Sequence, residues 1–169
     1  MIDDVIRGRR TIKQYEATAV PRSVVAALLD LAVYAPNHHR TEPWRFVVVG
    51  AEAIDRLVEA TGDLKLRRSP TAIVVAQVVA ADAAVAREDH AACAAAIQTL
   101  MLAARARDLA SYWRTPRSLD LPAARAILGL DEGVDVVGIV HVGTPSIPFP
   151  TPPRRSAGTV TRWLSYHSS

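Results

Sequence analysis

The chain has 169 residues, of which 50% are hydrophobic. This composition excludes extensive disorder and suits the core of one ordinary domain, so we expect a single domain over residues 1–169. The net charge is +3 at pH 7, and lysine occurs only at Lys13 and Lys65, so arginine carries nearly all of the positive charge. The arginine excess indicates either an anionic ligand, which arginine forks match well, or a biased coding composition. No block of basic residues is interleaved with aromatics, which argues against nucleic-acid binding.

The cysteine content and the apolar runs limit the cellular setting. The single cysteine, Cys93, lies in an alanine-rich run and is expected to be a small buried hydrophobe. One cysteine forms neither a disulfide nor a cysteine-based metal site within one chain. Residues 1–10 lack the apolar core of a signal peptide, and residues 91–104 are too few and too weakly apolar to span a bilayer. We therefore expect a cytoplasmic protein without a membrane partner.

Hydrophobic periodicity, prolines and glycines predict short helices and strands in alternation. Pro21 can begin a helix that Pro36 ends, and three consecutive valines before Gly50 indicate a buried strand. In chain order we expect a helix over 1–8, a helix over 21–34, an irregular polar segment over 37–43, a strand over 45–50, a helix over 51–60, a strand over 71–80, a long helix over 87–107, an extended piece over 111–113, a helix over 121–128, a strand over 135–142, an extended proline-rich segment over 143–153 and a helix over 158–166.

The long helix expected over residues 87–107 interrupts the strands, which indicates a layered α+β or α/β domain. Ile97, Leu100 and Met101 fall on one face of this helix, and its many alanines allow a neighbouring helix or chain to approach closely. No glycine-rich turn joins a strand to a helix, so the sequence contains neither a Rossmann motif nor a Walker loop.

Three cations and a hydroxyl fall within five residues after the first helix, at Arg9, Arg10, Thr11 and Lys13. A phosphate monoester carries close to two negative charges and several acceptor oxygens, so such a cluster fits it. A solvated basic surface is the alternative explanation.

A polar loop with two adjacent histidines, His38 and His39, joins the second helix to the first strand. Adjacent residues of an extended loop point in opposite directions, and no cysteine or carboxylate cluster completes a ligand set, so we expect no metal. Pro43 and Trp44 then lead into the strand, where Trp44 has the alternative role of a core aromatic.

In their order and spacing these segments resemble the nitroreductase family of FMN enzymes. That family has an Arg-x-Ser/Thr motif near the N-terminus and, further along, an Ala-Pro-Ser-type loop that ends in Gln-Pro-Trp before a strand. The counterparts here are Arg9-Arg10-Thr11, Ala35-Pro36-Asn37 and Glu42-Pro43-Trp44. The likeness is closest to the short members whose loop reads Ala-Pro-Asp-His, in which the histidine at the position of His38 contacts flavin.

Two later segments support the same resemblance. Trp113, Arg114 and Thr115 match a Trp-Arg-Ser triplet whose backbone and side chains line the flavin in the short members. Arg154 and Arg155 resemble the C-terminal basic pair of the family, one of which often reaches the FMN phosphate.

The resemblance implies an α+β nitroreductase-like fold, with a central, mainly antiparallel sheet flanked by helices, in an intertwined homodimer that holds FMN between its subunits. It implies an FMN-dependent oxidoreductase that transfers hydride from NADH or NADPH through flavin to a small acceptor, such as a nitroaromatic or quinone, in ping-pong order. The flavin carries the chemistry, so no catalytic side chain is expected. The implied cofactor-binding residues are Arg9, Arg10, Thr11, Lys13, Asn37, His38, Arg40, Trp113, Arg114, Thr115, Arg154 and Arg155.

Within this set, Arg9 and Arg155 suit the phosphate, and Lys13 or Arg114 suits the N1–O2 edge of the reduced ring. Arg40 stands where the family often has Asn, and Glu42 stands where it has Gln. These departures motivate a second interpretation, a flavin-binding carrier or sensor of the same fold without turnover. A third, suggested by the arginine excess alone, is a protein that binds another phosphorylated ligand.

Overall fold

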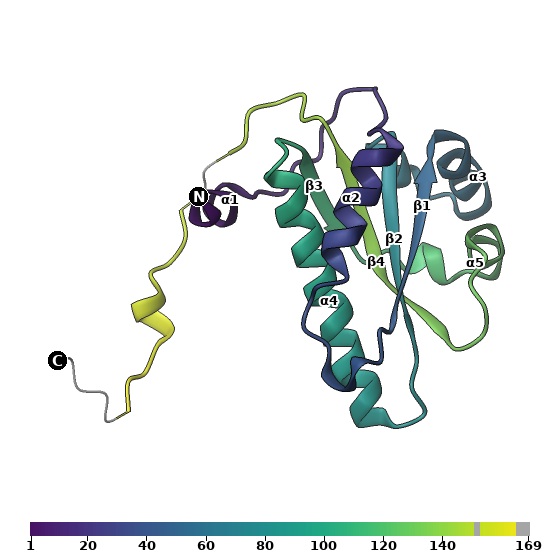
Figure 1. Ribbon diagram of the computed structural model, residues 1–169. Coiled ribbons are helices and arrows are strands. Elements are labelled where there is room, and N and C mark those ends of the chain that lie inside the picture. Colours follow the sequence, from purple (N-terminus) through teal and green to yellow (C-terminus); the bar gives the residue numbers. More distant parts are fainter. Residues whose placement is uncertain (151–152, 165–169) are drawn as a thin grey trace.

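Four strands form one antiparallel sheet at the centre of the molecule. The structure is a computed structural model that describes residues 1–150 and 153–164. The strands are β1 (Trp44–Gly50), β2 (Thr71–Val78), β3 (Ala110–Arg114) and β4 (Val134–Gly143). Their order in the sheet is β1-β2-β4-β3, and each neighbouring pair is antiparallel. The expected central antiparallel sheet is therefore confirmed (Figure 1).

Helices cover both faces of this sheet (Figure 1). On one face lie α2 (Arg22–Ala32) and α4 (Ala83–Arg105), which share a hydrophobic cluster with the strands. On the other face lie α3 (Ala51–Thr61) and α5 (Pro122–Leu128), with a second cluster. The result is a three-layer α+β domain, which agrees with the expected fold class.

The central strand β2 explains why the sheet needs cover on both faces. Side chains alternate along a strand, so Ile73 and Val75 join the cluster on the α2–α4 face. Ala72 and Val74 join the cluster on the α3–α5 face. A nearly unbroken apolar run therefore suits this strand, which is buried at seven of its eight positions.

The helix ends follow from local sequence. Asp82 caps α4, because its carboxylate accepts hydrogen bonds from the backbone N–H groups of Ala84 at 2.7 Å and Val85 at 3.0 Å. Gly62 and Gly129 follow α3 and α5 with left-handed backbones, at φ of 71° and 63°. Among the described residues, no helix combines the length and apolar character needed to cross a membrane.

The N-terminal segment runs along the sheet, whereas the C-terminal segment leaves it. After α1 (Ile2–Gly8), isolated bridges pair Thr11 with Ser111 and Tyr15 with Pro145. Residues up to Phe149 still contact the body, because Ser146 N donates to the carbonyl oxygen of Gln14 and the Phe149 ring lies against Arg105. The described chain from residue 153 onward extends away from the body on the side where α1 lies (Figure 1). The segment that carries Arg154 and Arg155 is therefore not packed on the sheet.

Most predicted elements are present, with two notable differences. The long helix begins at Ala83 rather than residue 87, because Asp82 supplies a cap four residues earlier than the apolar pattern suggests. The helix expected over 158–166 is wrong for its described part, which contains one 3-10 turn at Ala157–Val160 and then non-helical chain to Leu164. The side chains there are exposed, and a short helix without packing is not stable. Its last two residues lie outside the described ranges.

Candidate cofactor-binding site

The basic N-terminal segment lies against the outer edge of β3. Ile12 N donates to the carbonyl oxygen of Ser111 at 3.4 Å, beside the bridge between Thr11 and Ser111. Lys13 follows, and its Nζ lies 5.2 Å from the centroid of the Tyr112 ring. Two segments that are far apart in sequence therefore form one surface, as the proposed ligand site requires.

Three arginines approach one another where α1 ends. Burial lowers the pKa of Arg9, and the charges of Arg10 and Arg154 lower that pKa further. Arg10 is turned back on its own chain, because Nη1 donates to the carbonyl oxygen of Arg9 at 2.6 Å and also to that of Arg7. Arg155 is exposed next to Arg154. Like charges in proximity repel, so a bound anion would stabilise this cluster.

A hollow of about 450 Å³ opens at the end of β3, within the range of roughly 300–1,000 Å³ that is typical of small-molecule sites. Trp113 Nε1 and Arg114 Nη1 are buried and donate no hydrogen bond within the described residues. Neither donor is open to the hollow, and the indole nitrogen lies against Gly138 of β4. Its lining residues are Tyr112, Trp113, Arg114, Thr115 and Pro116.

Asp63 fixes the orientation of Arg114. Its Oδ2 accepts from Arg114 Nη2 at 2.8 Å and from Ser118 Oγ at 3.0 Å, and its Oδ1 accepts from Lys65 N at 3.0 Å. Burial alone would raise the pKa of Asp63, but the hydrogen bonds from Arg114 and Ser118 outweigh it and lower that pKa. Sequence reasoning missed Asp63, since one acid in a turn gives no sign of a partner fifty-one positions away.

Gly138 makes room for the Trp113 side chain on the neighbouring strand β4. A Cβ atom at Gly138 would lie 2.3 Å from Trp113 Nε1 and 2.5 Å from the carbonyl oxygen of Arg114. Only glycine permits this approach, so the edge of the indole lies directly against the backbone of β4. Sequence reasoning missed this role as well, although a glycine inside the most strand-like run of the chain is a known sign of close approach.

His141 is buried beneath the Tyr112 ring. The two rings stack with centroids 6.0 Å apart, and His141 Nδ1 lies 3.0 Å from Ser69 Oγ. Burial, followed by the charges of Arg114 and Arg68, lowers the pKa of His141 to about 4. The imidazole is therefore neutral at pH 7. The sequence offers no motif around this histidine.

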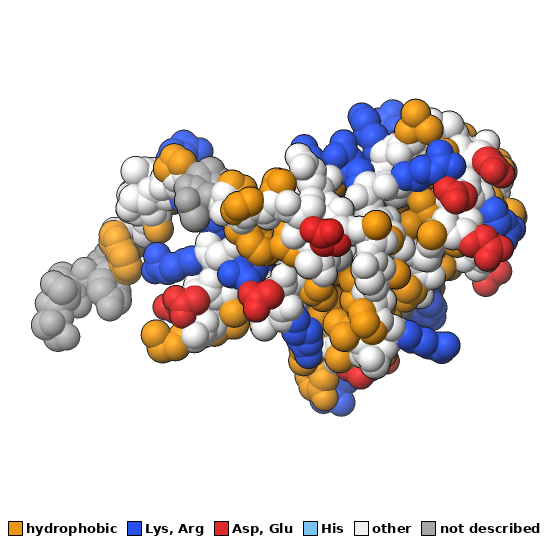
Figure 2. Space-filling view, turned by 90° about the horizontal axis from the view of Figure 1, so that it is seen from above, with side chains coloured by type: hydrophobic (Ala, Val, Ile, Leu, Met, Phe, Trp, Pro, Cys, Tyr) orange, Lys and Arg blue, Asp and Glu red, His pale blue; other side chains and the backbone are white. Residues whose placement is uncertain are grey.

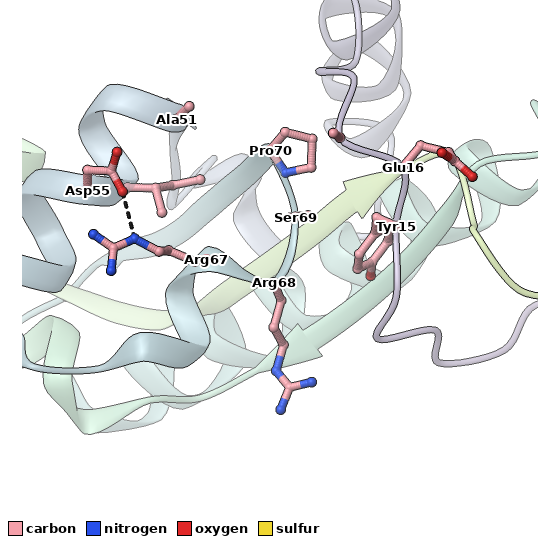
Figure 3. A pocket seen from close by; sticks show the side chains of 10 residues that line it. Tyr15, Glu16, Ala51, Asp55, Arg67, Arg68, Ser69 and Pro70 are labelled. Carbon is pink, nitrogen blue, oxygen red and sulfur yellow. Dashed lines mark hydrogen bonds and ion pairs between the residues drawn. The ribbon is translucent and has the colours of Figure 1, made fainter.

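A smaller hollow of about 270 Å³ lies between the N-terminal segment, α3 and the turn before β2 (Figure 3). Arg67 points to Asp55 on α3, with Nε 2.7 Å from Oδ1, whereas Arg68 extends away from this pair. The guanidinium of Arg68 instead lies 5.6 Å from the centroid of the Tyr112 ring. Arg68 thus adds a second cation beside Lys13 at the β3 surface, which the sequence motifs did not indicate.

The loop with the two histidines lies apart from the β3 hollow. His38 Nδ1 is 2.7 Å from Glu88 Oε2 on α4, and Arg40 is exposed. Beside this contact, a hollow of about 430 Å³ is lined by residues of the loop and of α4. It shares no lining residue with the hollow at β3. Within one chain, the predicted site residues therefore form separate sets. Thr11 and Lys13 lie beside β3, whose end carries Trp113, Arg114 and Thr115. Arg9, Arg10 and Arg154 approach one another where α1 ends, with Arg155 next to Arg154 in the chain, and Asn37, His38 and Arg40 belong to the loop before β1.

Comparison with known proteins identifies the class to which this fold and site belong. The model of the nitroreductase family matches residues 6–67 and 60–144. YfhC of Bacillus subtilis, a provisional NAD(P)H nitroreductase, is 28% identical over 164 residues, with 86% of this chain and 84% of that protein covered. The chain therefore belongs to the nitroreductase family, as the sequence motifs suggested.

Solved structures support the same fold. A nitroreductase-like family protein from Bacillus cereus superposes with a TM-score of 0.88 at 25% identity, covering 98% of this chain and 97% of the other. A nitroreductase from Bacteroides fragilis, solved with bound FMN, superposes with a TM-score of 0.79 at 25% identity, covering 96% and 98%. The nitroreductase-like fold class is confirmed by these similarities.

Proposed function

We propose that the protein is an FMN-dependent oxidoreductase that takes hydride from NADH or NADPH and reduces a small acceptor such as a nitroaromatic or a quinone. The observation that carries the proposal is the hollow at the end of β3, which Trp113 and Arg114 line, next to a surface where Lys13 and Arg68 lie beside the Tyr112 ring. Family membership and the FMN-bound relative from Bacteroides fragilis support this choice of ligand. The proposed location is the cytoplasm.

The donor set at this site fits FMN in two parts. The mutual repulsion of Arg9, Arg10 and Arg154 suits a phosphate monoester, with Arg9 and either Arg154 or Arg155 as its ligands. The ammonium of Lys13, or the guanidinium of Arg114 that lines the hollow, suits the acceptor-rich edge of the flavin ring. When bound, FMN supplies the two-electron chemistry that no side chain of this site offers.

The residues of the chain would bind and orient the ligands and exclude water from the site. Asp63 accepts a hydrogen bond from the Arg114 guanidinium and is itself held by Ser118, so the orientation of Arg114 at the hollow is fixed before a ligand binds. Trp113 lines the hollow and packs against the hydrophobic cluster, so it supplies an apolar border to the site. One slot that binds first the nicotinamide hydride donor and then the electron acceptor gives ping-pong kinetics. No side chain acts as a nucleophile.

We propose that the protein works as a homodimer. The loop at His38 lies apart from the β3 hollow in one chain, and a two-fold partner would bring the loop of one subunit to the hollow of the other. Ile2 and Ile6 of α1 are 64% and 52% exposed, and Val160 and Leu164 of the C-terminal segment are 76% and 72% exposed. Figure 2 shows these protruding parts with hydrophobic side chains on their surface. A second chain covering them would remove this apolar area from water.

The ultraviolet–visible spectrum of the purified protein tests the proposal. We expect flavin bands after incubation with FMN and desalting, and rapid bleaching when NADH or NADPH is added under nitrogen. Protein that stays colourless after soaking in excess FMN would refute flavin binding. Sedimentation of the same sample reports whether the subunits pair.

The alternative function is a flavin-binding carrier or sensor without turnover. The observation in its favour is the loop of the altered residues, where Arg40 and Glu42 have positive φ values of 53° and 46°. Both functions give a yellow protein. Only the enzyme bleaches within the mixing time and turns over an added quinone, so a protein whose bands persist with both donors would be the carrier or sensor.

A further inference from the structure

We propose that Thr41 and Glu88 are positioning residues, which act with the buried carboxylate of Asp89 to preset the loop over residues 37–42 for the cofactor site. This inference rests on the proposed flavin function and deepens it. It concerns how one chain holds Asn37 and His38 ready before any ligand arrives.

The backbone of this loop is unusual. His39, Arg40 and Glu42 have φ values of 57°, 53° and 46°, and none of them is glycine. Residues with side chains rarely adopt this left-handed region, and three in four consecutive positions persist only where the surroundings over-determine them. Something outside the loop must therefore hold it.

A relay of side chains supplies this hold. Asn37 Oδ1 accepts from Glu42 N at 2.8 Å, and Asn37 Nδ2 donates to Thr41 Oγ1 at 2.9 Å, which closes the loop on itself. The Thr41 hydroxyl in turn donates to Asp89 Oδ1 on α4. Each polar group of the relay has a defined donor or acceptor role, so the loop is tied to α4 in one register.

Asp89 is an unexpected residue at its position, because its side chain is only 3% exposed on the face of α4 that joins the core. Buried carboxylates are rare unless they are hydrogen-bonded, and aspartate is not a good helix former. The hydrogen bond that Asp89 Oδ1 accepts from the Thr41 hydroxyl explains a carboxylate at this buried position. Glu42 contributes its backbone N–H to the relay, so the relay does not depend on which side chain stands at that position.

Glu88, the preceding residue on α4, holds the other end of the loop. A carboxylate only accepts, so His38 Nδ1 donates to Glu88 Oε2 across 2.7 Å. In the neutral ring this leaves Nε2 as a free acceptor. The pair thus selects both the orientation and the tautomer of the histidine that lines the loop hollow.

The test compares Thr41→Val, Thr41→Ser and Glu88→Ala with the wild type. Thr41→Val removes the hydroxyl at constant shape, Thr41→Ser keeps it, and Glu88→Ala replaces an exposed acid by the best helix former, so α4 stays intact. Thr99→Val is the matched control, because the Thr99 hydroxyl donates within α4 to the carbonyl oxygen of Ala95 at 2.9 Å.

Two readouts are needed. Hydrogen–deuterium exchange compares the exchange rate of peptides over residues 37–42 with that of peptides from β2. Quenching of flavin fluorescence measures the dissociation constant of FMN. We expect Thr41→Val to speed exchange in the loop and to raise the FMN dissociation constant by about tenfold each, the effect of one hydrogen bond to a charged group. Glu88→Ala has a similar but smaller effect, Thr41→Ser restores both values, and Thr99→Val changes neither.

The outcomes separate the inference from the function on which it rests. Unchanged loop exchange in Thr41→Val and Glu88→Ala would overturn the positioning role, even if the wild type binds FMN tightly. Faster exchange with an unchanged FMN dissociation constant would overturn the link between loop and cofactor, and would leave the proposed enzyme standing. A wild type that binds no FMN would overturn the proposed function and the link between loop and cofactor, whereas loop exchange in Thr41→Val would still decide whether the relay holds the loop.

Discussion

The clearest quantitative prediction concerns Gly138→Ala. The added Cβ would meet Trp113 Nε1 at 2.3 Å and the Arg114 carbonyl oxygen at 2.5 Å. The indole can rotate away, but the carbonyl belongs to the backbone of β3, so the strand pair must separate. Overpacking of this kind costs about 2–3 kcal/mol, and for a domain of this size that loss lowers the melting temperature by about 5–10 °C.

The matched control is Gly50→Ala. A Cβ at Gly50 meets nothing within 4 Å, so the only expected cost is the poorer N-cap of α3, at most about 1 kcal/mol. Urea unfolding followed by circular dichroism, at one fixed protein concentration, compares the midpoints of the two variants. We also expect Gly138→Ala to bind FMN more weakly than Gly50→Ala, because Trp113 and Arg114 line the hollow. Equal midpoints and equal affinities would show that the indole does not lie against the backbone of β4.

Three further predictions use the charges of the site. Arg9→Ala should raise the FMN dissociation constant at least tenfold, whereas Arg22→Ala, an exposed change on α2, should leave it unaltered; equal values in a fluorescence titration would remove the phosphate assignment. Asp63 has a lowered pKa in the fold, so its ion pair with Arg114 stabilises the protein above the ordinary aspartate pKa and is lost as the pH falls towards the lowered pKa. The gap in urea midpoint between wild type and Asp63→Asn should stay constant from neutral pH down to about pH 5 and narrow as the pH falls below about 4, and a gap that is unchanged in acid contradicts this. Burial lowers the pKa of His141 to about 4, so below about pH 6.5 the unfolded chain binds a proton that the folded chain does not. The free energy of unfolding of the wild type should therefore fall by about 1.4 kcal/mol per pH unit down to about pH 4, relative to that of His141→Asn. Parallel pH profiles of the two proteins would contradict this prediction.

Much of the architecture follows from local patterns in the sequence. The apolar run of β2 and the spacing of apolar residues in α4 reflect which side chains meet the core, and these periods are properties of the strand and the helix themselves. The segments at Arg9, from Ala35 to Trp44, at Trp113 and at Arg154 together indicated the family, because they recur in the right order, although none of them does so alone. Their roles toward a ligand remain predictions.

Other features depend on contacts between distant parts of the chain. The pairing of Asp63 with Arg114 joins positions fifty-one residues apart, and no local pattern marks either as a partner of the other. The prediction of a C-terminal helix was wrong for a related reason, since Val160 and Leu164 have the spacing of a helix but remain exposed among the described residues.

The sequence by itself determined where the strands and most helices run, because backbone propensity and side-chain alternation act over a few residues. Only the tertiary structure decided which side chains share the β3 hollow, which ones hold the loop over residues 37–42, and why Gly138 must lack a side chain. These depend on distances between segments that meet only after folding, when burial gives each unpaired charge or donor a large free-energy cost and so selects its partner.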